Sequence, residues 1–205
     1  YLLNKKSNGD LDIAKKYIAL GGGNPGIGAD LADLSSSYAD AEKYVGLTGG
    51  DAKKAIDLMI YTSTSNEAQQ YNNVAGGDVD TMLTFAYATT NVEYAKKYIG
   101  LASSPKSAAK LAEFMADEFP EKDQDERFDG AQVLLNQCKS GLCSITETTD
   151  GTITGIVVEN GEIKEFQTWK KGFPPEEVDK KLYSEVKAPS SGGKVTFNTA
   201  NVQVP

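Results

Sequence analysis

Apolar and polar positions recur with a fixed period over residues 10–116. Each of four segments begins with an alanine and places a tyrosine three positions later and an aliphatic residue six positions later. The segments begin at Ala14, Ala41, Ala68 and Ala95, so the same 27-residue interval separates each one from the next. Spacings of three and four residues are typical of one face of a helix, so each segment predicts a short amphipathic helix. The constant interval predicts an array of repeated units.

Residues typical of helix ends and turns flank each segment. The residues four positions before the alanines are preferred N-caps, and they are Asp10, Ser37, Thr64 and Asn91. In the first three copies two glycines follow, and glycine adopts the left-handed backbone that a reversing helix needs. Second caps come next, at Asn24, Asp51 and Asp78, with Pro105 in the fourth copy. Each unit is therefore predicted to be a helical hairpin, with helices of about eight and about ten residues.

One hairpin of this length buries too little surface to fold alone, so the four copies are expected to stack. The repeated tyrosines Tyr17, Tyr44, Tyr71 and Tyr98 are expected to anchor the core, with their hydroxyls at its edge. In the second copy, helical spacing from Ala55 and Leu58 places Met59 in the core as well.

The same spacing leaves Ile60 and Tyr61 at the edge of the array, and Tyr87 holds a comparable place in the third copy. These three residues are the candidate binding residues. Two interpretations of the tyrosines remain open. They either form an apolar patch for a partner or pack against adjacent units, since buried or half-buried tyrosine is common in protein cores.

The periodicity changes after about residue 117. Residues 117–130 are charged and turn-prone and predict a linker, and residues 131–137 predict one or two further helical turns. From residue 144 onward the pattern alternates and predicts three strands, separated by hairpin turns at Asp150-Gly151 and Asn160-Gly161. A short helix beginning at Pro175 or Glu176 and a final strand over 194–204 follow.

The predicted fold class is therefore α+β. Residues 1–117 are predicted to form an all-α array of four 27-residue helical hairpins. Residues 118–137 are predicted to form a linker and a short helix, and residues 138–205 a small, strand-rich mixed domain.

Charge and composition restrict the function. The net charge of −8 repels phosphate backbones and anionic lipid, and no apolar run approaches the roughly 18 residues that span a bilayer. The chain contains no histidine, which removes the usual general base and every Ser-His or Cys-His nucleophile. Phosphate-binding and dinucleotide-binding glycine motifs are also missing. We therefore expect no enzymatic activity, no cofactor, no metal site, no nucleic-acid partner and no membrane insertion.

The two cysteines, Cys138 and Cys143, stand five positions apart around a Ser-Gly turn. A disulfide is sterically allowed if this loop turns back on itself, and free thiols are equally compatible with the spacing. Free thiols are typical of a cytoplasmic protein, whereas a disulfide is typical of a secreted or cell-surface protein.

The second repeat resembles the last two helices of ubiquitin-associated (UBA-like) domains, particularly those of adaptor proteins of the AAA+ segregase. The residues that match this family's motif best are Ala41, Tyr44, Leu47, Gly49, Gly50, Asp51, Ala55, Ile56 and Leu58. The third repeat matches through Asp78, Leu83, Phe85 and Tyr87. The likeness implies weak ubiquitin binding through an apolar patch. The chain lacks the Met-Gly-Phe/Tyr loop that is usual in the family.

The C-terminal region is faintly similar to the SEP domain, which occurs beside UBA-like domains in segregase adaptors. Gly161, Lys171, Gly172, Pro175 and Glu177 carry this likeness. Two functions are therefore expected as alternatives. One is a protein-binding adaptor whose partner is ubiquitin or an AAA+ segregase. The other is a structural subunit that uses the repeats as a packing scaffold in a filament, particle or cell-surface assembly.

Overall fold

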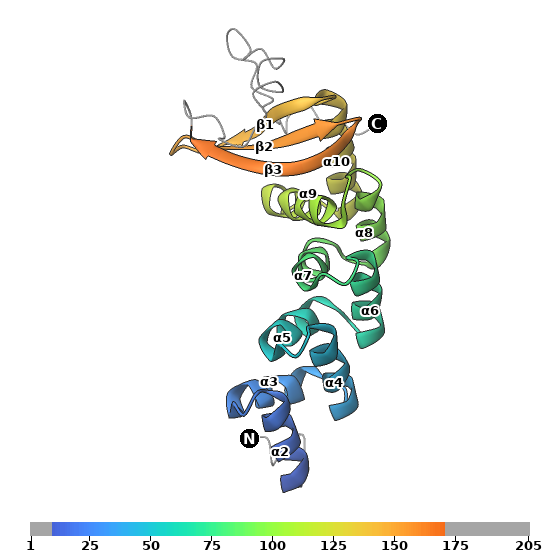
Figure 1. Cartoon of the computed structure of the whole chain (residues 1–205), viewed down its shortest axis with the longest axis vertical. Coiled ribbons are helices and arrows are strands. Elements are labelled where there is room, and N and C mark those ends of the chain that lie inside the picture. The colour runs from blue at the N-terminus through green and yellow to red at the C-terminus, as the bar shows by residue number, and fades with distance from the viewer. Residues whose placement is uncertain (1–9, 171–205) are drawn as a thin grey trace. The chain divides into compact units, whose positions relative to one another are not determined.

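The computed structural model describes residues 10–170 of the chain. In this range the chain forms nine helices followed by a three-stranded sheet (Figure 1). The helices are α2 (Leu11–Leu20), α3 (Pro25–Leu34), α4 (Tyr38–Leu47), α5 (Ala52–Tyr61), α6 (Ser65–Val74), α7 (Val79–Ala88), α8 (Val92–Ile99), α9 (Pro105–Glu118) and α10 (Gln124–Gln137). The strands are β1 (Gly141–Glu147), β2 (Thr152–Glu159) and β3 (Glu162–Lys170). A helical region followed by a small antiparallel sheet confirms the predicted α+β class.

The chain divides into two compact units, Tyr1–Lys96 and Lys97–Pro205. Each unit is described by itself below. The domain boundaries predicted after residues 117 and 137 stay predictions.

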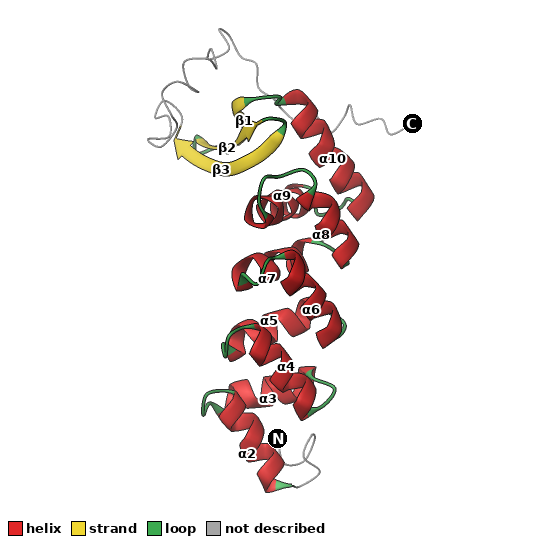
Figure 2. Ribbon diagram, turned by 45° about the vertical axis from the view of Figure 1, so that its right-hand side comes forward, coloured by secondary structure: helices red, strands yellow, loops and turns green. Residues whose placement is uncertain are grey.

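The helices of the first unit form two layers (Figure 2). Helices α2, α4 and α6 lie in one layer and α3, α5 and α7 in the other, and each helix of the first layer packs against the helix that follows it. Within the layers, α4 contacts α2 and α6, and α5 contacts α3 and α7. The first-layer helices begin at Leu11, Tyr38 and Ser65, which repeats the interval that separates Ala14, Ala41 and Ala68. The helices therefore follow the period of the sequence in this unit.

Local chemistry explains where these helices begin and end. Each N-cap predicted in this unit accepts backbone N–H groups of its own helix, as Asp51 does from Lys53 at 3.0 Å. Gly49 and Gly50 have φ values of +67° and +93°, in the left-handed region that the turn requires. The Gly50 N–H donates to the carbonyl of Val45 at 2.9 Å and closes the end of α4.

A tyrosine hydroxyl contact recurs through the core of the first unit. Tyr17, Tyr44 and Tyr71 are almost fully buried, and each hydroxyl meets the hydroxyl of a Ser or Thr 18 residues later. The oxygen–oxygen distances are 3.4 Å for Tyr17–Ser35, 3.1 Å for Tyr44–Thr62 and 2.9 Å for Tyr71–Thr89. The predicted role of these tyrosines as core anchors is confirmed, but the prediction that their hydroxyls lie at the edge of the core was wrong, because each hydroxyl contacts a buried Ser or Thr.

The second unit departs from the regular period. Helix α7 begins at Val79, and the repeat interval predicts that α9 begins at residue 106, but α9 begins one position earlier, at Pro105. Helix α9 is also longer, with 14 residues where α7 has 10. Its N-cap is Ser104, whose Oγ accepts the N–H of Ser107 at 3.1 Å. Buried Tyr98 packs edge-on against Phe128 of α10, with ring centroids 5.4 Å apart.

Helix α10 begins inside the stretch 117–130 that the sequence predicts as a linker, so that prediction was wrong over residues 124–130, whereas the helical turns predicted over 131–137 lie in this helix. Asp123 and Glu126 form a capping box: each side chain accepts the backbone N–H of the other residue. Local capping therefore starts a helix in a segment whose composition is typical of a linker. Burial of Ala131 and Leu134 fixes this helix to the unit.

The sheet is antiparallel in the order β1-β2-β3. Asn160 and Gly161 have φ values of +53° and +80° in the β2–β3 turn, and Gly151 has +78° in the β1–β2 turn, so both hairpin predictions are confirmed. Strand β3 contacts α9, and the loop before that helix forms a parallel bridge between Ala102 and Ile163. The sheet is thereby held against α9 within this unit.

The remaining sequence predictions fall outside the described residues. These are the helix beginning at Pro175 or Glu176, the strand over 194–204, and the SEP-like residues Lys171, Gly172, Pro175 and Glu177.

Candidate functional site

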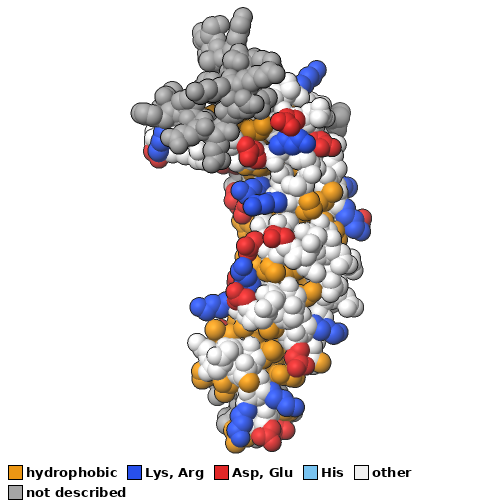
Figure 3. Space-filling model, viewed as in Figure 1, with side chains coloured by type: hydrophobic (Ala, Val, Ile, Leu, Met, Phe, Trp, Pro, Cys, Tyr) orange, Lys and Arg blue, Asp and Glu red, His pale blue; other side chains and the backbone are white. Residues whose placement is uncertain are grey.

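The candidate binding residues lie at the last turns of two neighbouring helices. Ile60 and Tyr61 end α5, and Tyr87 is the penultimate residue of α7. Their exposed fractions are 60%, 42% and 47%, whereas Met59 is buried at 7%. The helical spacing in the sequence therefore separates the exposed residues of α5 from its core residues correctly. Figure 3 shows hydrophobic side chains at the surface of the helical region, interspersed with acidic and basic groups.

The two exposed tyrosines contact each other. The rings of Tyr61 and Tyr87 lie edge to face, with centroids 5.5 Å apart and an interplanar angle of 67°. This geometry places the positive edge of one ring against the negative face of the other. The pair joins α5 to α7, so each tyrosine both packs against the adjacent helix and remains exposed. The structure therefore shows packing between adjacent units, and a binding role for the exposed parts of the two tyrosines stays a prediction.

A third helix adds a residue that the sequence analysis missed. Leu34 is the tenth and last residue of α3, as Tyr61 is of α5, and it is 46% exposed. The sequence could have indicated Leu34, because this residue lies one full repeat interval before Tyr61. We call the four side chains Leu34, Ile60, Tyr61 and Tyr87 the apolar row.

Acidic groups border the apolar row. Asp33 precedes Leu34, and Asp57 lies one helical turn before Ile60 and Tyr61 on the same face of α5; both are exposed. At the other end of these two helices, in their first turns, Lys54 of α5 and Asp80 of α7 form an ion pair with a distance of 2.6 Å between Lys54 Nζ and Asp80 Oδ1. The hydrogen bond to Asp80 raises the pKa of Lys54. The row therefore suits a partner that carries apolar or aromatic side chains beside basic groups.

A separate cavity of about 340 Å³ lies between α2 and α4. Lys16 Nζ lies 5.9 Å from the centroid of the Tyr38 ring, and Ser36 Oγ donates to Asp40 at 3.0 Å beside it. Asp40 places a carboxylate close to the beginning of α4, which disfavours an anionic ligand there. The hydroxyls of Tyr17 and Ser35 contact each other at 3.4 Å in its lining.

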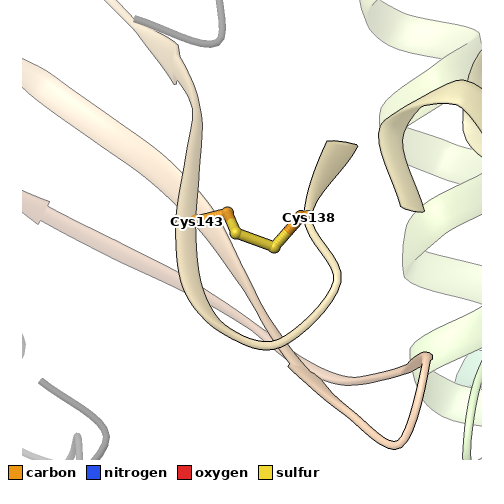
Figure 4. Close-up of a disulfide and its surroundings, with 2 residues drawn as sticks. All are labelled: Cys138 and Cys143. Carbon is orange, nitrogen blue, oxygen red and sulfur yellow. A yellow bond between two sulfur atoms is a disulfide. The ribbon is translucent and has the colours of Figure 1, made fainter. Parts of the chain in front are cut away.

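The second site named by the sequence is the cysteine pair. Cys138 directly follows α10 and Cys143 lies in β1, and the structure joins them in a disulfide with their Cα atoms 6.0 Å apart (Figure 4). Of the two alternatives that the spacing left open, the structure contains the bridge. It closes a short loop and fixes the end of the helix to the first strand.

Over residues 10–170, no group of three or more His, Cys, Asp or Glu side chains is placed to hold a metal ion. A search of the same residues for helices long and apolar enough to cross a membrane finds none.

Comparison with protein-family models, curated proteins and solved structures finds no match for this chain. The likeness to UBA-like and SEP domains therefore stays a prediction. The functional argument below rests on the geometry and chemistry of the apolar row.

Proposed function

We propose that this chain is a non-enzymatic protein-binding scaffold, in which four repeated helical hairpins over residues 10–118 present the apolar row to a protein partner. The observation that carries the proposal is that three helices, α3, α5 and α7, each expose a large apolar side chain in the last turn. Single exposed apolar side chains are ordinary, whereas a group on neighbouring helices is typical of an interaction surface.

The composition of the row supports this role. Tyrosine is among the residues that contribute most to binding energy at protein interfaces. The edge-to-face contact already orients Tyr61 and Tyr87, so a partner loses less side-chain entropy on ordering them. Burying the exposed part of each ring contributes on the order of 2 kcal/mol. A surface of this size favours weak binding, with a Kd from about 10 μM to about 1 mM.

Ubiquitin is the first partner that we propose. The UBA-like motif falls on α4 and α5, and Tyr61 of the apolar row ends α5. An AAA+ segregase is the second, on the basis of the combined UBA-like and SEP-like resemblance. A cytoplasmic location fits both partners.

The disulfide favours a second candidate function. A bridge between Cys138 and Cys143 is typical of proteins in an oxidising compartment. In this alternative the chain is a secreted or cell-surface structural subunit. The apolar row then forms a packing contact in a larger assembly.

A ubiquitin titration followed by NMR on the isotope-labelled full chain tests the first function. Ubiquitin at up to about 1 mM is expected to shift the resonances of Ile60, Tyr61 and Tyr87, and the double variant Tyr61→Ser/Tyr87→Ser is expected to abolish those shifts. Leu11→Ser is the matched control, because Leu11 is 53% exposed on α2 and lies outside the row. Far-UV circular dichroism must show that both variants are folded.

The remaining outcomes separate the two functions. If ubiquitin causes no shifts, but sedimentation shows self-association that the double variant abolishes, the structural-subunit alternative is correct. If wild type and double variant behave alike in both experiments, the apolar row does not bind these partners and the proposal is wrong.

A further inference from the structure

The first of the two hairpin turns in the sheet holds its polar groups tightly. In the β1–β2 turn, Asp150 accepts hydrogen bonds from the N–H of Thr152 at 3.0 Å and from Lys170 Nζ at 2.6 Å. The N–H of Gly151 donates to the carbonyl of Thr148 at 2.9 Å. The hydrogen bond from Lys170 is the largest of the contacts that hold the pKa of the Asp150 carboxyl well below its usual range. Both the carboxylate and the nitrogen that follows it are therefore already bound.

The β2–β3 turn has the same kind of residue pair, Asn160 and Gly161, without these bonds. Both residues are exposed, and within residues 10–170 neither the Asn160 side chain nor the Gly161 N–H has a hydrogen-bond partner. A Cβ at Gly161 would meet nothing within 4 Å, so the space around its backbone is open. Of the asparagines in the described range, Asn160 alone precedes a glycine. The turn therefore places an unbound amide next to an unbound and unhindered backbone nitrogen.

We propose that Asn160 is a site of spontaneous covalent modification, at which the side-chain amide is lost and the main chain is rerouted. A base removes the proton of the Gly161 N–H, and the nitrogen attacks Asn160 Cγ to close a cyclic succinimide. The Cγ–Nδ2 bond breaks, and the amide group leaves as ammonia with that proton. Water then adds across one imide C–N bond. Opening at Cγ gives aspartate, and opening at the main-chain carbonyl gives isoaspartate. The step consumes only water and transfers no electrons.

The same reaction is suppressed in the β1–β2 turn. An ionised carboxylate is a poor electrophile, and the low pKa keeps Asp150 ionised. The hydrogen bond to the Thr148 carbonyl also holds the Gly151 nitrogen away from attack. The two turns of one sheet are therefore expected to differ in reactivity because of their hydrogen bonds.

Isoaspartate changes the attachment of β3. The main chain then runs through Cβ and Cγ of residue 160 and lengthens a tight two-residue turn. Ile163 follows this turn closely and is fully buried. Its N–H donates to the carbonyl of Leu101 at 3.3 Å, and its carbonyl accepts the N–H of Ser103 at 3.1 Å. A longer turn displaces Ile163 from these partners, so the modification loosens the contact between β3 and the loop before α9.

Peptide mapping of the aged full chain tests the proposal. The folded protein is incubated for weeks in mildly alkaline and in mildly acidic buffer, and mass spectrometry follows each peptide. An isoaspartate-specific methyltransferase with a labelled methyl donor measures the isoaspartate. Conversion of Asn160 is expected, faster in the alkaline buffer because the attacking nitrogen must lose its proton, while Asp150 stays unchanged. The map separates Asn160 from the other Asn-Gly pair, Asn8-Gly9, which lies outside the described residues.

Asp150→Asn is the matched control, because it places an identical Asn-Gly pair in the turn whose glycine N–H is bonded. In the folded variant the introduced asparagine is expected to react more slowly than Asn160, whereas in urea the two react at similar rates. Equal rates in the folded variant overturn the proposal, and so does a wild-type Asn160 that stays intact when folded but reacts in urea. The wild-type comparison decides alone if circular dichroism shows that the variant is unfolded.

NMR tests the structural consequence. The Ser103 amide resonance is expected to shift in the isoaspartate form and to stay near its wild-type position in Asn160→Asp, which adds the charge without lengthening the main chain. A Ser103 resonance that is unchanged in the isoaspartate form shows that β3 keeps its contact and overturns this part of the inference. The proposed function does not depend on either result, because the apolar row lies in the first unit.

Discussion

Replacing Thr62 with valine is expected to destabilise the protein more than replacing Thr89 with valine, although both changes remove the same hydroxyl group. Each threonine directly follows its helix and donates Oγ1 to the carbonyl four residues earlier, at 2.7 Å for Thr62 and 2.8 Å for Thr89. Both have extended backbones, with φ values of −124° and −121°, which valine adopts readily. The direct cost of the substitution is therefore similar at the two positions.

The tyrosine beside each threonine makes the difference. The Tyr71 hydroxyl meets Thr89 Oγ1 at 2.9 Å and also donates to the Thr89 backbone carbonyl at 3.2 Å, which valine retains. Among the described residues, the structure gives the Tyr44 hydroxyl one partner, Thr62 Oγ1 at 3.1 Å. Tyr44 is only 3% exposed, so Thr62→Val leaves its hydroxyl buried without that bond. This costs about 1–3 kcal/mol, against about 0.5–1 kcal/mol for Thr89→Val.

Urea unfolding followed by far-UV circular dichroism measures both losses, provided that the slopes of the transitions agree. A double-mutant cycle with Tyr44→Phe isolates the contact. Removing the Tyr44 hydroxyl is expected to destabilise the wild type but to recover stability in Thr62→Val, where no bond remains to be lost. Equal losses for the two threonine variants, or an equal cost of Tyr44→Phe in both backgrounds, would refute the reasoning.

Two further predictions concern a close helix contact and pH. A Cβ at Gly28 would lie 2.8 Å from the Tyr17 carbonyl oxygen and 2.9 Å from Ile18 Cα, so Gly28→Ala is expected to cost about 1–3 kcal/mol in urea unfolding. Gly46→Ala, where a Cβ meets nothing within 4 Å, is expected to stabilise by about 0.5–1 kcal/mol, and the reverse order contradicts the packing. Burial raises the pKa of Tyr71 from 10.0 to about 12, so its contribution to stability is present below pH 10 and is lost as the pH rises through about 12. Tyr71→Phe is expected to flatten the fall in stability between those pH values, and an unchanged slope excludes this residue as its cause.

Helix boundaries in the first unit follow from the sequence because local chemistry determines them. Asp51 and Gly50 act within a few residues of their own positions, and neither needs a distant partner. The first turns of α10, over residues 124–130, were missed although a local capping box of Asp123 and Glu126 begins them. These charged turns resemble a linker, and packing that the sequence does not display stabilises the helix. A Cβ at buried Gly130 would lie 2.7 Å from Met115 Cε, which shows how closely α10 approaches α9.

The candidate site was predictable residue by residue but not as an arrangement. Periodicity within α5 is enough to expose Ile60 and Tyr61 and to bury Met59. The contact between Tyr61 and Tyr87 depends on how α5 and α7 pack, because the two residues lie one position short of a full repeat interval and so break the register. Leu34 keeps that register with Tyr61, but the sequence alone does not reveal that it is exposed.

The same one-residue difference decides which residue of α9 corresponds to the apolar row. The constant repeat interval pairs Phe114 with Tyr87, whereas counting from the beginning of each helix pairs Phe114 with Tyr61. One residue rotates a side chain by about 100° around a helix, so the two alignments predict different faces. Counting from the helix beginning places buried Leu111 and Ala112 of α9 opposite buried Phe85 and Ala86 of α7, but it also places half-buried Phe114 opposite buried Ala88. Neither alignment therefore keeps every buried position of α9 in register with α7, because α9 begins one residue early and has 14 residues where α7 has 10.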